Sequence, residues 1–118
     1  MKKNEFFAQN KHFFVEDVEA VKQYVLNHCP QSAIAKIIER ADEACAQSFR
    51  FDLRWDMEYT EIPVVFDKEI NWLHQPADDP EWIFAFNRHH FWITMGQAYV
   101  LTGDEKYAEA FVKQCKSW

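Results

Sequence analysis

The stretch between residues 79 and 104 constrains the fold of this chain most, because it is apolar in every direction around a helix and still holds a polar run. That run consists of Asn87, Arg88, His89 and His90. A helix that is hydrophobic on all sides must be buried over most of its surface. The polar side chains that it takes inside must then be hydrogen-bonded or line a cavity. We therefore predict one continuous helix from Pro80 to Leu101 or Thr102 that forms an inner wall of a larger helical protein.

The composition favours an all-α fold. The chain has 118 residues, which suggests one domain or a piece of one, and 48% of them are hydrophobic, which is ample for a core. Two glycines and four prolines provide few of the turns that a many-stranded sandwich or barrel needs. No apolar run reaches the roughly 18 residues of a membrane span, and residues 1–12 lack the apolar segment of a signal peptide. We expect no membrane association and a cytoplasmic protein, or a periplasmic or secreted one if a signal has been removed.

The charge and the cysteines bear on partners and cofactors. A net charge of −6 argues against nucleic acid, whose binders usually carry a basic stripe. It argues mildly against polyanions, although a cleft can be locally basic on an acidic protein. Cys29, Cys45 and Cys115 are widely spaced and have no second cysteine or histidine at metal-ligand spacing, so we interpret them as reduced thiols. We expect neither a metal nor any other cofactor.

Hydrophobic periodicity divides the chain into three parts. Residues 1–48 contain two helical patterns separated by Pro30, which predicts a leading helical hairpin whose second helix is capped by Ser32. Residues 49–78 lose the helical rhythm and are rich in aromatic side chains, which predicts an extended aromatic arm between hairpins. Residues 79–118 predict a second hairpin with Gly103 as its left-handed residue. The inward face of its last helix is predicted from residues spaced about one turn apart, namely Tyr107, Phe111, Cys115 and Trp118.

A repeat signature supplies an alternative function. The first helix of a tetratricopeptide unit is matched by Trp92, Met95, Gly96 and Tyr99, followed by Ala108. No second copy exists upstream, and stable arrays need about three repeats. The alternative hypothesis is a stand-alone helical module of this kind that binds a protein partner. In either case we expect Gly96 to let a neighbouring helix approach closely, and Trp92 and Tyr99 to fill the groove between hairpin helices.

The polar run has an ordinary and a functional interpretation. Alone, His89 is more often a satisfied core histidine than a ligand or base, and Arg88 more often pairs with an acid, here Asp52, Asp56 or Glu58 of the arm. His89 and His90 diverge by about 100° on a helix and cannot chelate one metal ion. Residue types that stack on sugar rings and bind hydroxyl groups or carboxylates are also present: Trp72, Trp82, Asn87, Arg88 and His89. Composition leaves both interpretations open.

An ordered series of motifs resembles a known family. The motifs are Asn71-Trp72, Pro80-Glu81-Trp82, Phe86-Asn87-Arg88-His89 and the run Thr-Gly-Asp-Glu-Lys-Tyr-Ala over residues 102–108. Together they are similar to the N-terminal region of heparinase II/III-type polysaccharide lyases over residues 49–118. The resemblance implies an incomplete (α/α) toroid followed by β-sheet domains, so that this all-α chain would form the opening helical hairpins of the toroid.

The resemblance also implies an activity and partners. Family members cleave acidic polysaccharides, such as heparan sulfate or alginate, by β-elimination. No residue here matches the family's catalytic set, so no catalytic residue is assigned, and the chain alone should be inactive. Asn87, Arg88 and His89 would lie on an inner toroid helix, where they line the sugar cleft or support it, with a lesser stacking role for Trp72 and Trp82. The expected partners are an acidic polysaccharide, the remainder of the parent chain and, for the isolated fragment, a second copy.

Overall fold

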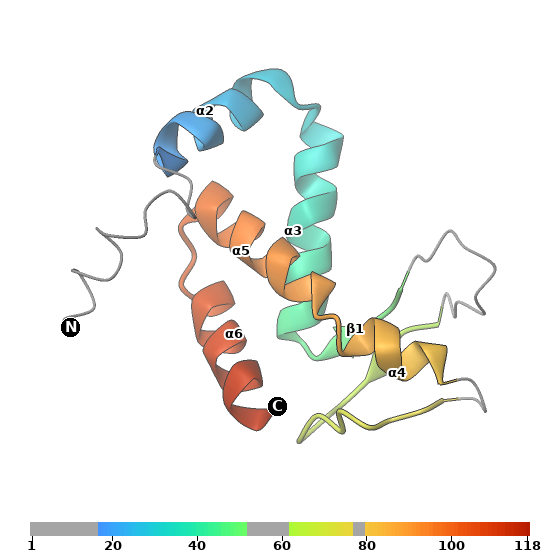
Figure 1. Ribbon diagram of the computed structural model, residues 1–118. Helices are drawn as coiled ribbons and strands as arrows, with labels where there is room; N and C mark the ends of the chain where they lie inside the picture. Colours follow the sequence, from blue (N-terminus) through green and yellow to red (C-terminus); the bar gives the residue numbers. More distant parts are fainter. Residues whose placement is uncertain (1–16, 52–61, 77–79) are drawn as a thin grey trace.

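The computed structural model describes residues 17–51, 62–76 and 80–118, and helices make up most of them (Figure 1). The elements in chain order are α2 (Val18–His28), α3 (Gln31–Cys45), β1 (Ser48–Phe49), β2 (Val64–Val65), α4 (Glu81–Phe86), α5 (His90–Thr102) and α6 (Lys106–Ser117). Within these residues the strands form only a short two-stranded sheet. The prediction of an all-α fold is confirmed.

Helix α3 is the scaffold of the fold, because it packs along α5 and also contacts α6 and β1. Its apolar residues recur three and four positions apart, and three of them, Ile34, Ala41 and Ala44, are buried on that face. The helix begins at Gln31, directly after Pro30, and no side chain caps it. The cap predicted at Ser32 is therefore wrong, since Ser32 already lies in the first turn.

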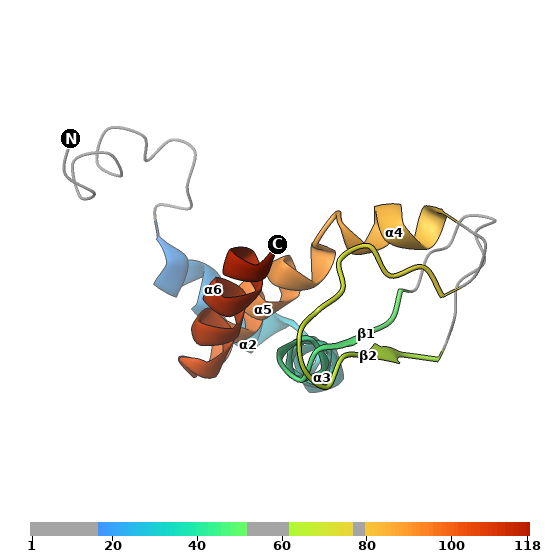
Figure 2. The same ribbon diagram turned by 90° about the horizontal axis from the view of Figure 1, so that it is seen from below.

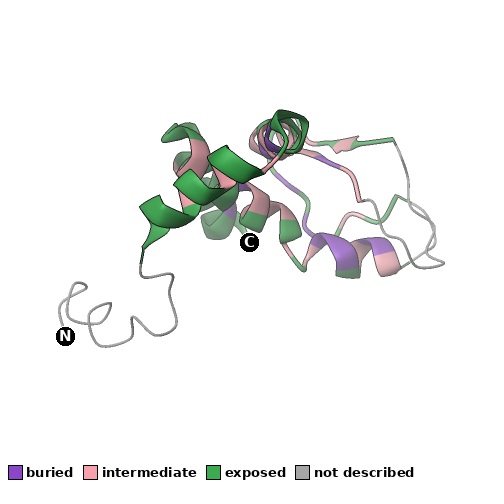
Figure 3. Cartoon of the chain, turned by 90° about the horizontal axis from the view of Figure 1, so that it is seen from above, coloured by how far each residue is buried: buried purple, intermediate pink, exposed green. Residues whose placement is uncertain are grey.

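Helix α2 is the most exposed helix. Asp17 caps its start by accepting a hydrogen bond from the backbone N–H of Ala20 at 2.8 Å, yet none of its residues is buried (Figure 3). The sequence predicted an antiparallel hairpin of α2 and α3, whereas the two axes are steeply inclined in Figure 1 and α2 packs on α5. The cause is the short connection: Cys29 and Pro30 (ψ 142° and 139°) turn the chain before α3 can fold back along α2.

The stretch predicted as one helix over residues 80–102 is two helices, so that prediction is wrong. Helix α4 ends at Phe86, and α5 begins at His90. Between them lies a turn at residues 87–89 in which His89 has a left-handed backbone (φ 54°, ψ 33°). Histidine is one of the residue types that tolerate this region, although the conformation still costs about 1–2 kcal/mol.

A side chain at the turn explains the break. The amide of Asn87 donates to the carbonyl of Ile83 at 3.0 Å, one turn earlier in α4, and to the carbonyl of Trp72 in the arm at 2.9 Å. Asparagine side chains that bond nearby backbone groups compete with helix continuation. The apolar pattern predicts helix correctly on both sides of the break, but it carries no sign of the bond to Trp72, which is 15 residues away in sequence.

The aromatic arm folds back on itself as a short ribbon. Strands β1 and β2 pair antiparallel, with Phe49 opposite Val64. The amide of Gln47 holds this pairing by donating to the carbonyls of Phe66 at 2.6 Å and Lys68 at 2.9 Å. Figure 2 shows the ribbon at the end of α3, with residues 66–76 running from it towards α4. The remaining arm residues, 52–61 and 77–79, lie outside the described part of the chain.

The core is aromatic and is centred on Phe86, which is fully buried at the end of α4. Six rings surround it at centroid distances of 4.8–6.1 Å: Phe49, Phe51, Phe66, Trp72, Trp82 and Phe91. They come from the arm, α4 and the start of α5, and burying one such side chain contributes about 1.5–3 kcal/mol. The cluster continues between α3, α5 and α6 through Met95, Ala98 and Tyr107. Aromatic packing thus joins the arm to the helices.

Helix α6 follows α5 after Gly103, which has the predicted left-handed backbone (φ 71°). Tyr107 is buried on its inner face as predicted, but the other three predicted core residues, Phe111, Cys115 and Trp118, are exposed. The second buried residue of α6 is Gln114, two turns after Tyr107. The face of α6 that packs against the rest of the protein therefore differs from the predicted one and includes the polar side chain of Gln114.

Gln114 can be buried because both its amide nitrogen and its amide oxygen have a hydrogen-bond partner. It donates to the carbonyl of Ala44 in α3 at 2.8 Å and accepts from the indole N–H of Trp92 in α5 at 2.8 Å. Trp92 thereby fills the space between α5 and α6, as predicted. Tyr99 does not: it is 37% exposed, and its hydroxyl donates to Glu105.

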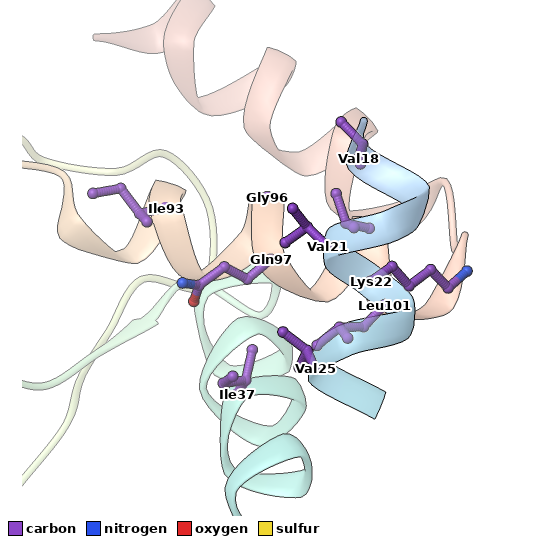
Figure 4. A pocket seen from close by; sticks show the side chains of 10 residues that line it. Val18, Val21, Lys22, Val25, Ile37, Ile93, Gly96, Gln97 and Leu101 are labelled. Atoms are coloured by element: carbon purple, nitrogen blue, oxygen red, sulfur yellow. The ribbon is translucent and has the colours of Figure 1, made fainter. Parts of the chain in front are cut away.

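An apolar groove of about 410 Å³ lies between α2 and α5 (Figure 4). Its lining includes Val21, Val25, Ile93 and Leu101. Gly96 is in its wall, and a Cβ atom there would meet nothing within 4 Å, so the close helix approach expected at Gly96 is wrong. Ile93 is 63% exposed. The enclosure predicted on both flanks of α5 is not supplied by the described residues of this chain.

We predict that Gln114→Leu lowers the free energy of unfolding by about 2 kcal/mol, because the Trp92 indole would lose its acceptor and the Ala44 carbonyl would lose its side-chain donor. Urea denaturation measures the change. The matched control is Gln97→Leu at an exposed position of α5, which should stay within about 0.5 kcal/mol of the wild type. Equal losses in the two variants would contradict a structural role for the buried amide.

A second prediction concerns acid stability. Asp42 of α3 accepts from the Tyr107 hydroxyl at 2.8 Å and from the ammonium of Lys106 at 2.9 Å, and the Lys106 hydrogen bond lowers the pKa of Asp42. A carboxylate whose pKa is lower in the folded than in the unfolded protein stabilises the fold at any pH above its unfolded-state pKa, which is about 3.9 for aspartate. This stabilisation is lost as the pH falls through the pKa of the folded protein. The melting temperature should therefore drop below about pH 4.

Asp42→Asn should lose part of this acid-dependent drop, whereas Asp67→Asn in an exposed turn should keep the wild-type profile. Thermal unfolding followed by circular dichroism from neutral to acid pH measures both. Parallel profiles for the wild type and Asp42→Asn would show that this carboxylate does not link α3 to α6 energetically.

Candidate functional site

The turn between α4 and α5 holds three of the five predicted site residues, and Asn87 organises it. Both donor contacts of its amide go to the backbone, at Trp72 and Ile83, and its Oδ1 accepts from the indole N–H of Trp118 at 2.8 Å. One side chain therefore ties the arm, α4 and the last residue of α6 together. These three hydrogen bonds give Asn87 a structural role in stabilising the turn.

His89 lies in a cage of indole rings. Its imidazole stacks on Trp92 with centroids 3.9 Å apart and planes 7° apart, and it meets Trp118 and Trp72 edge-on at 5.0 and 5.5 Å. Burial lowers the pKa of His89, so the ring is neutral at neutral pH. Its Nε2 is buried and has no hydrogen-bond partner among the described residues. A neutral ring nitrogen can either donate or accept a proton in a hydrogen bond, depending on the tautomer.

Arg88 is exposed and forms no ion pair within residues 17–51, 62–76 and 80–118. The acids weighed as its partners, Asp52, Asp56 and Glu58, lie outside the described residues. Its guanidinium has planar donors that suit a carboxylate or sulfate. Of the residues in the turn, Arg88 is the cation that can meet an anionic ligand without rearrangement.

The two predicted stacking residues are in the core. Trp72 is 8% exposed and Trp82 is 6% exposed, and both pack against Phe86. The indole of Trp72 donates to the hydroxyl of Ser117 at 3.2 Å. A ring buried to this extent cannot offer a face to a sugar, so substrate stacking by Trp72 and Trp82 stays a prediction that their burial disfavours.

The sequence reasoning missed the contribution of α6 to the site. Trp118 holds Asn87, Ser117 holds Trp72, and Gln114 holds Trp92 beneath His89. Gln114 follows Tyr107 by two helical turns, and this spacing of seven places both on one face of α6. That periodicity marks Gln114 as an inward position, although an inward stripe of apolar residues alone does not include it.

The described residues contain no group of three or more histidine, cysteine, aspartate or glutamate side chains able to hold a metal ion. Among the same residues, none of the helices is long and apolar enough to cross a membrane. The polar groups available at the turn are the exposed guanidinium of Arg88, which can bind an anion, and the neutral ring of His89, which can form a hydrogen bond.

Comparison with known proteins identifies the family. Residues 5–118 match the family described as Heparinase II/III N-terminus. The chain is 32% identical, over 66% of its length, to a heparin-sulfate lyase of Bacteroides stercoris, and 28% identical, over 99% of its length, to one of Bacteroides thetaiotaomicron. It is also 40% identical, over 45% of its length, to a heparin-sulfate lyase of Pedobacter heparinus. No significant match to a solved structure was found.

These matches cover 11%, 18% and 8% of the three relatives, so the chain spans less than a fifth of the curated proteins that it matches. The family match, in contrast, extends over nearly the whole chain, including the polar turn and the leading helices. The predicted resemblance is confirmed, and the chain belongs to the heparinase II/III N-terminal family.

Proposed function

We propose that this chain is the N-terminal helical part of a polysaccharide lyase that cleaves uronate-containing glycans, heparan sulfate-like or alginate-like, by β-elimination. The observation that carries the proposal is the family match over residues 5–118, together with three relatives named heparin-sulfate lyase. The helical structure is compatible with the opening hairpins of an (α/α) toroid, which itself stays a prediction.

The proposed reaction needs more groups than the turn provides. The enzyme must neutralise the uronate carboxylate, remove the proton from the adjacent carbon and protonate the leaving oxygen. Arg88 can serve the first task, but the described residues show no paired acid and base near it. We therefore propose that the chain alone is catalytically incomplete and that the proton-transfer groups belong to the remainder of the parent protein.

The exposed apolar surface supports a need for that remainder. The groove between α2 and α5 is almost entirely aliphatic, and Val21 and Ile93 in it are 49% and 63% exposed. Relatives extend far beyond the matched part, so further helices of the parent chain are the proposed cover of this surface. In an isolated fragment, a second copy could take their place.

In this proposal, Arg88 borders the sugar cleft of the parent enzyme, whereas Asn87 and His89 stabilise the wall of the cleft without contacting the sugar. The support for this division is geometric: Arg88 is exposed and unpaired among the described residues, whereas Asn87 makes three hydrogen bonds and His89 is caged by indoles.

The first test is activity. The 118-residue chain, offered heparan sulfate, hyaluronan or alginate, should show no rise in the ultraviolet absorbance of unsaturated uronate products, whereas the parent protein should show one with at least one of these glycans. Turnover by the short chain would overturn its catalytic incompleteness. A parent protein inactive on every uronate-containing glycan would overturn the lyase proposal.

The second test distinguishes a substrate-binding role of Arg88 from a purely structural role in the parent enzyme. Arg88→Ala should raise KM by about five- to tenfold, because a charge-assisted contact to the substrate is lost. Its melting temperature should change by less than about 3 °C, since the side chain is exposed. Asn87→Ala is the matched comparison and should lower the melting temperature instead. An unchanged KM for Arg88→Ala would remove Arg88 from the cleft.

A further inference from the structure

A second groove lies beside the start of α5, between this helix and α3. It has a volume of about 290 Å³, close to the lower end of ligand-binding cavities, which span about 300–1,000 Å³. We call it the basic groove, and its charged and polar lining includes Lys36, Arg40, Glu43, Arg50, His90 and Thr94. We propose that the basic groove binds an anionic sugar residue, one that carries a sulfate or a carboxylate group. The choice of a sugar rests on the proposed function, whereas the choice of an anion rests on the groove itself.

The sequence places most of the charged and polar lining on two facing helices, and Arg50 follows strand β1. Lys36, Arg40 and Glu43 are spaced by four and three residues in α3 and so share one face of that helix. His90 and Thr94 are spaced by four residues at the start of α5. The packing of α3 along α5 brings these two faces to the same groove. The left-handed turn at residues 87–89 separates His90 from His89, so that one histidine joins the indole cage and the next lines the groove.

The charge of the groove is opposite to that of the chain. Among the described residues, three permanent cations, Lys36, Arg40 and Arg50, line it together with the carboxylate of Glu43, an excess of two positive charges in a chain of net charge −6. Like charges that gather in a partly enclosed site repel one another unless an anion compensates them. The excess is therefore evidence for an anionic ligand rather than for a purely structural ion pair.

Glu43 holds the two guanidinium groups in place. Its Oε2 accepts from Nε of Arg50 at 3.1 Å and from Nη1 of Arg40 at 3.2 Å, and its Oε1 pairs with Nη2 of Arg50. A guanidinium has five N–H donors, so Arg40 and Arg50 both keep donors beyond those committed to Glu43. Their side chains are 28% and 32% exposed, so these donors remain accessible to a ligand. Ion pairs this exposed add little to stability, which weakens the purely structural explanation.

Two further groups in the groove have unused hydrogen-bonding capacity. Lys36 and His90 are exposed, and neither has a hydrogen-bond or ion-pair partner among the described residues. Aromatic side chains supply the apolar part of the lining: Phe49 and Phe91 lie with ring centroids 4.7 Å apart, and Phe51 lies beside them. An apolar wall with a few convergent charged donors is typical of a small-ligand site and suits a sugar ring that bears an acidic group.

Direct binding tests the proposal without relying on catalysis. Isothermal titration calorimetry of the 118-residue chain with a heparin-derived tetrasaccharide should show binding. Lys36→Gln/Arg40→Gln should weaken it by at least about tenfold, because each charge-assisted hydrogen bond to an anion contributes a factor of this size. The matched control, Lys113→Gln/Lys116→Gln on α6, removes the same charge outside the groove and should change Kd by less than about twofold.

A single variant guards against loss of the fold. Lys36→Gln changes an exposed side chain without a partner in the described chain, so it should keep the wild-type circular dichroism spectrum and still weaken binding by more than the control pair does. Equal weakening by the groove pair and the α6 pair would overturn the proposal, since attraction by overall charge would then explain the binding. Absence of binding by the wild-type chain would overturn it as well.

Two further ligands identify the chemical group. A desulfated tetrasaccharide that keeps its carboxylates should bind as tightly as the sulfated one if the groove takes a carboxylate, and far more weakly if it takes a sulfate; both results support an anionic sugar. A neutral tetrasaccharide that binds as tightly as the acidic ones would overturn it. Failure of the proposed lyase function has a different signature, because the parent protein would then show no turnover while this binding persisted.

Discussion

The amide of Asn87 is the constraint on which the rest of the structure depends. By bonding the carbonyls of Ile83 and Trp72 and the indole of Trp118, it ends α4, fixes the arm and secures the last turn of α6. The chain can then enter the left-handed turn at His89 and start α5 in a new direction. A continuous helix would carry Phe86 and Phe91 on one rigid axis. The break instead lets both rings pack in the same aromatic cluster.

Hydrogen bonds from the indole N–H groups of three tryptophans also join separate parts of the structure. Trp72, Trp92 and Trp118 are large apolar side chains with one polar donor each, and each donor is satisfied by a side chain from another element: Ser117, Gln114 and Asn87. Buried polar groups are costly only when they are left unpaired. These pairings make an aromatic interface specific, because α6 must dock in the one position where all three oxygens meet their donors.

The start of α5 divides two chemical environments. On one side His89 is held neutral among indoles, and on the other His90 faces the basic groove beside Lys36 and Arg40. Arg88, the preceding residue, is exposed between them. This arrangement places cationic and hydrogen-bonding groups on an otherwise acidic protein in one region, which fits the acidic glycan proposed as the ligand of the parent enzyme.

Much of the fold could be predicted from sequence, because helix type depends on local periodicity and the inward stripe of α3 and the left-handed Gly103 are local features. The family resemblance was also carried by short motifs. The tertiary structure alone decided the rest. The helix break at Asn87 depends on a carbonyl 15 residues away, the burial of Gln114 depends on α3 and α5, and the basic groove depends on the packing of α3 along α5. Local propensity cannot report such contacts, since the free energy that selects them comes from groups that are distant in sequence and adjacent only after folding.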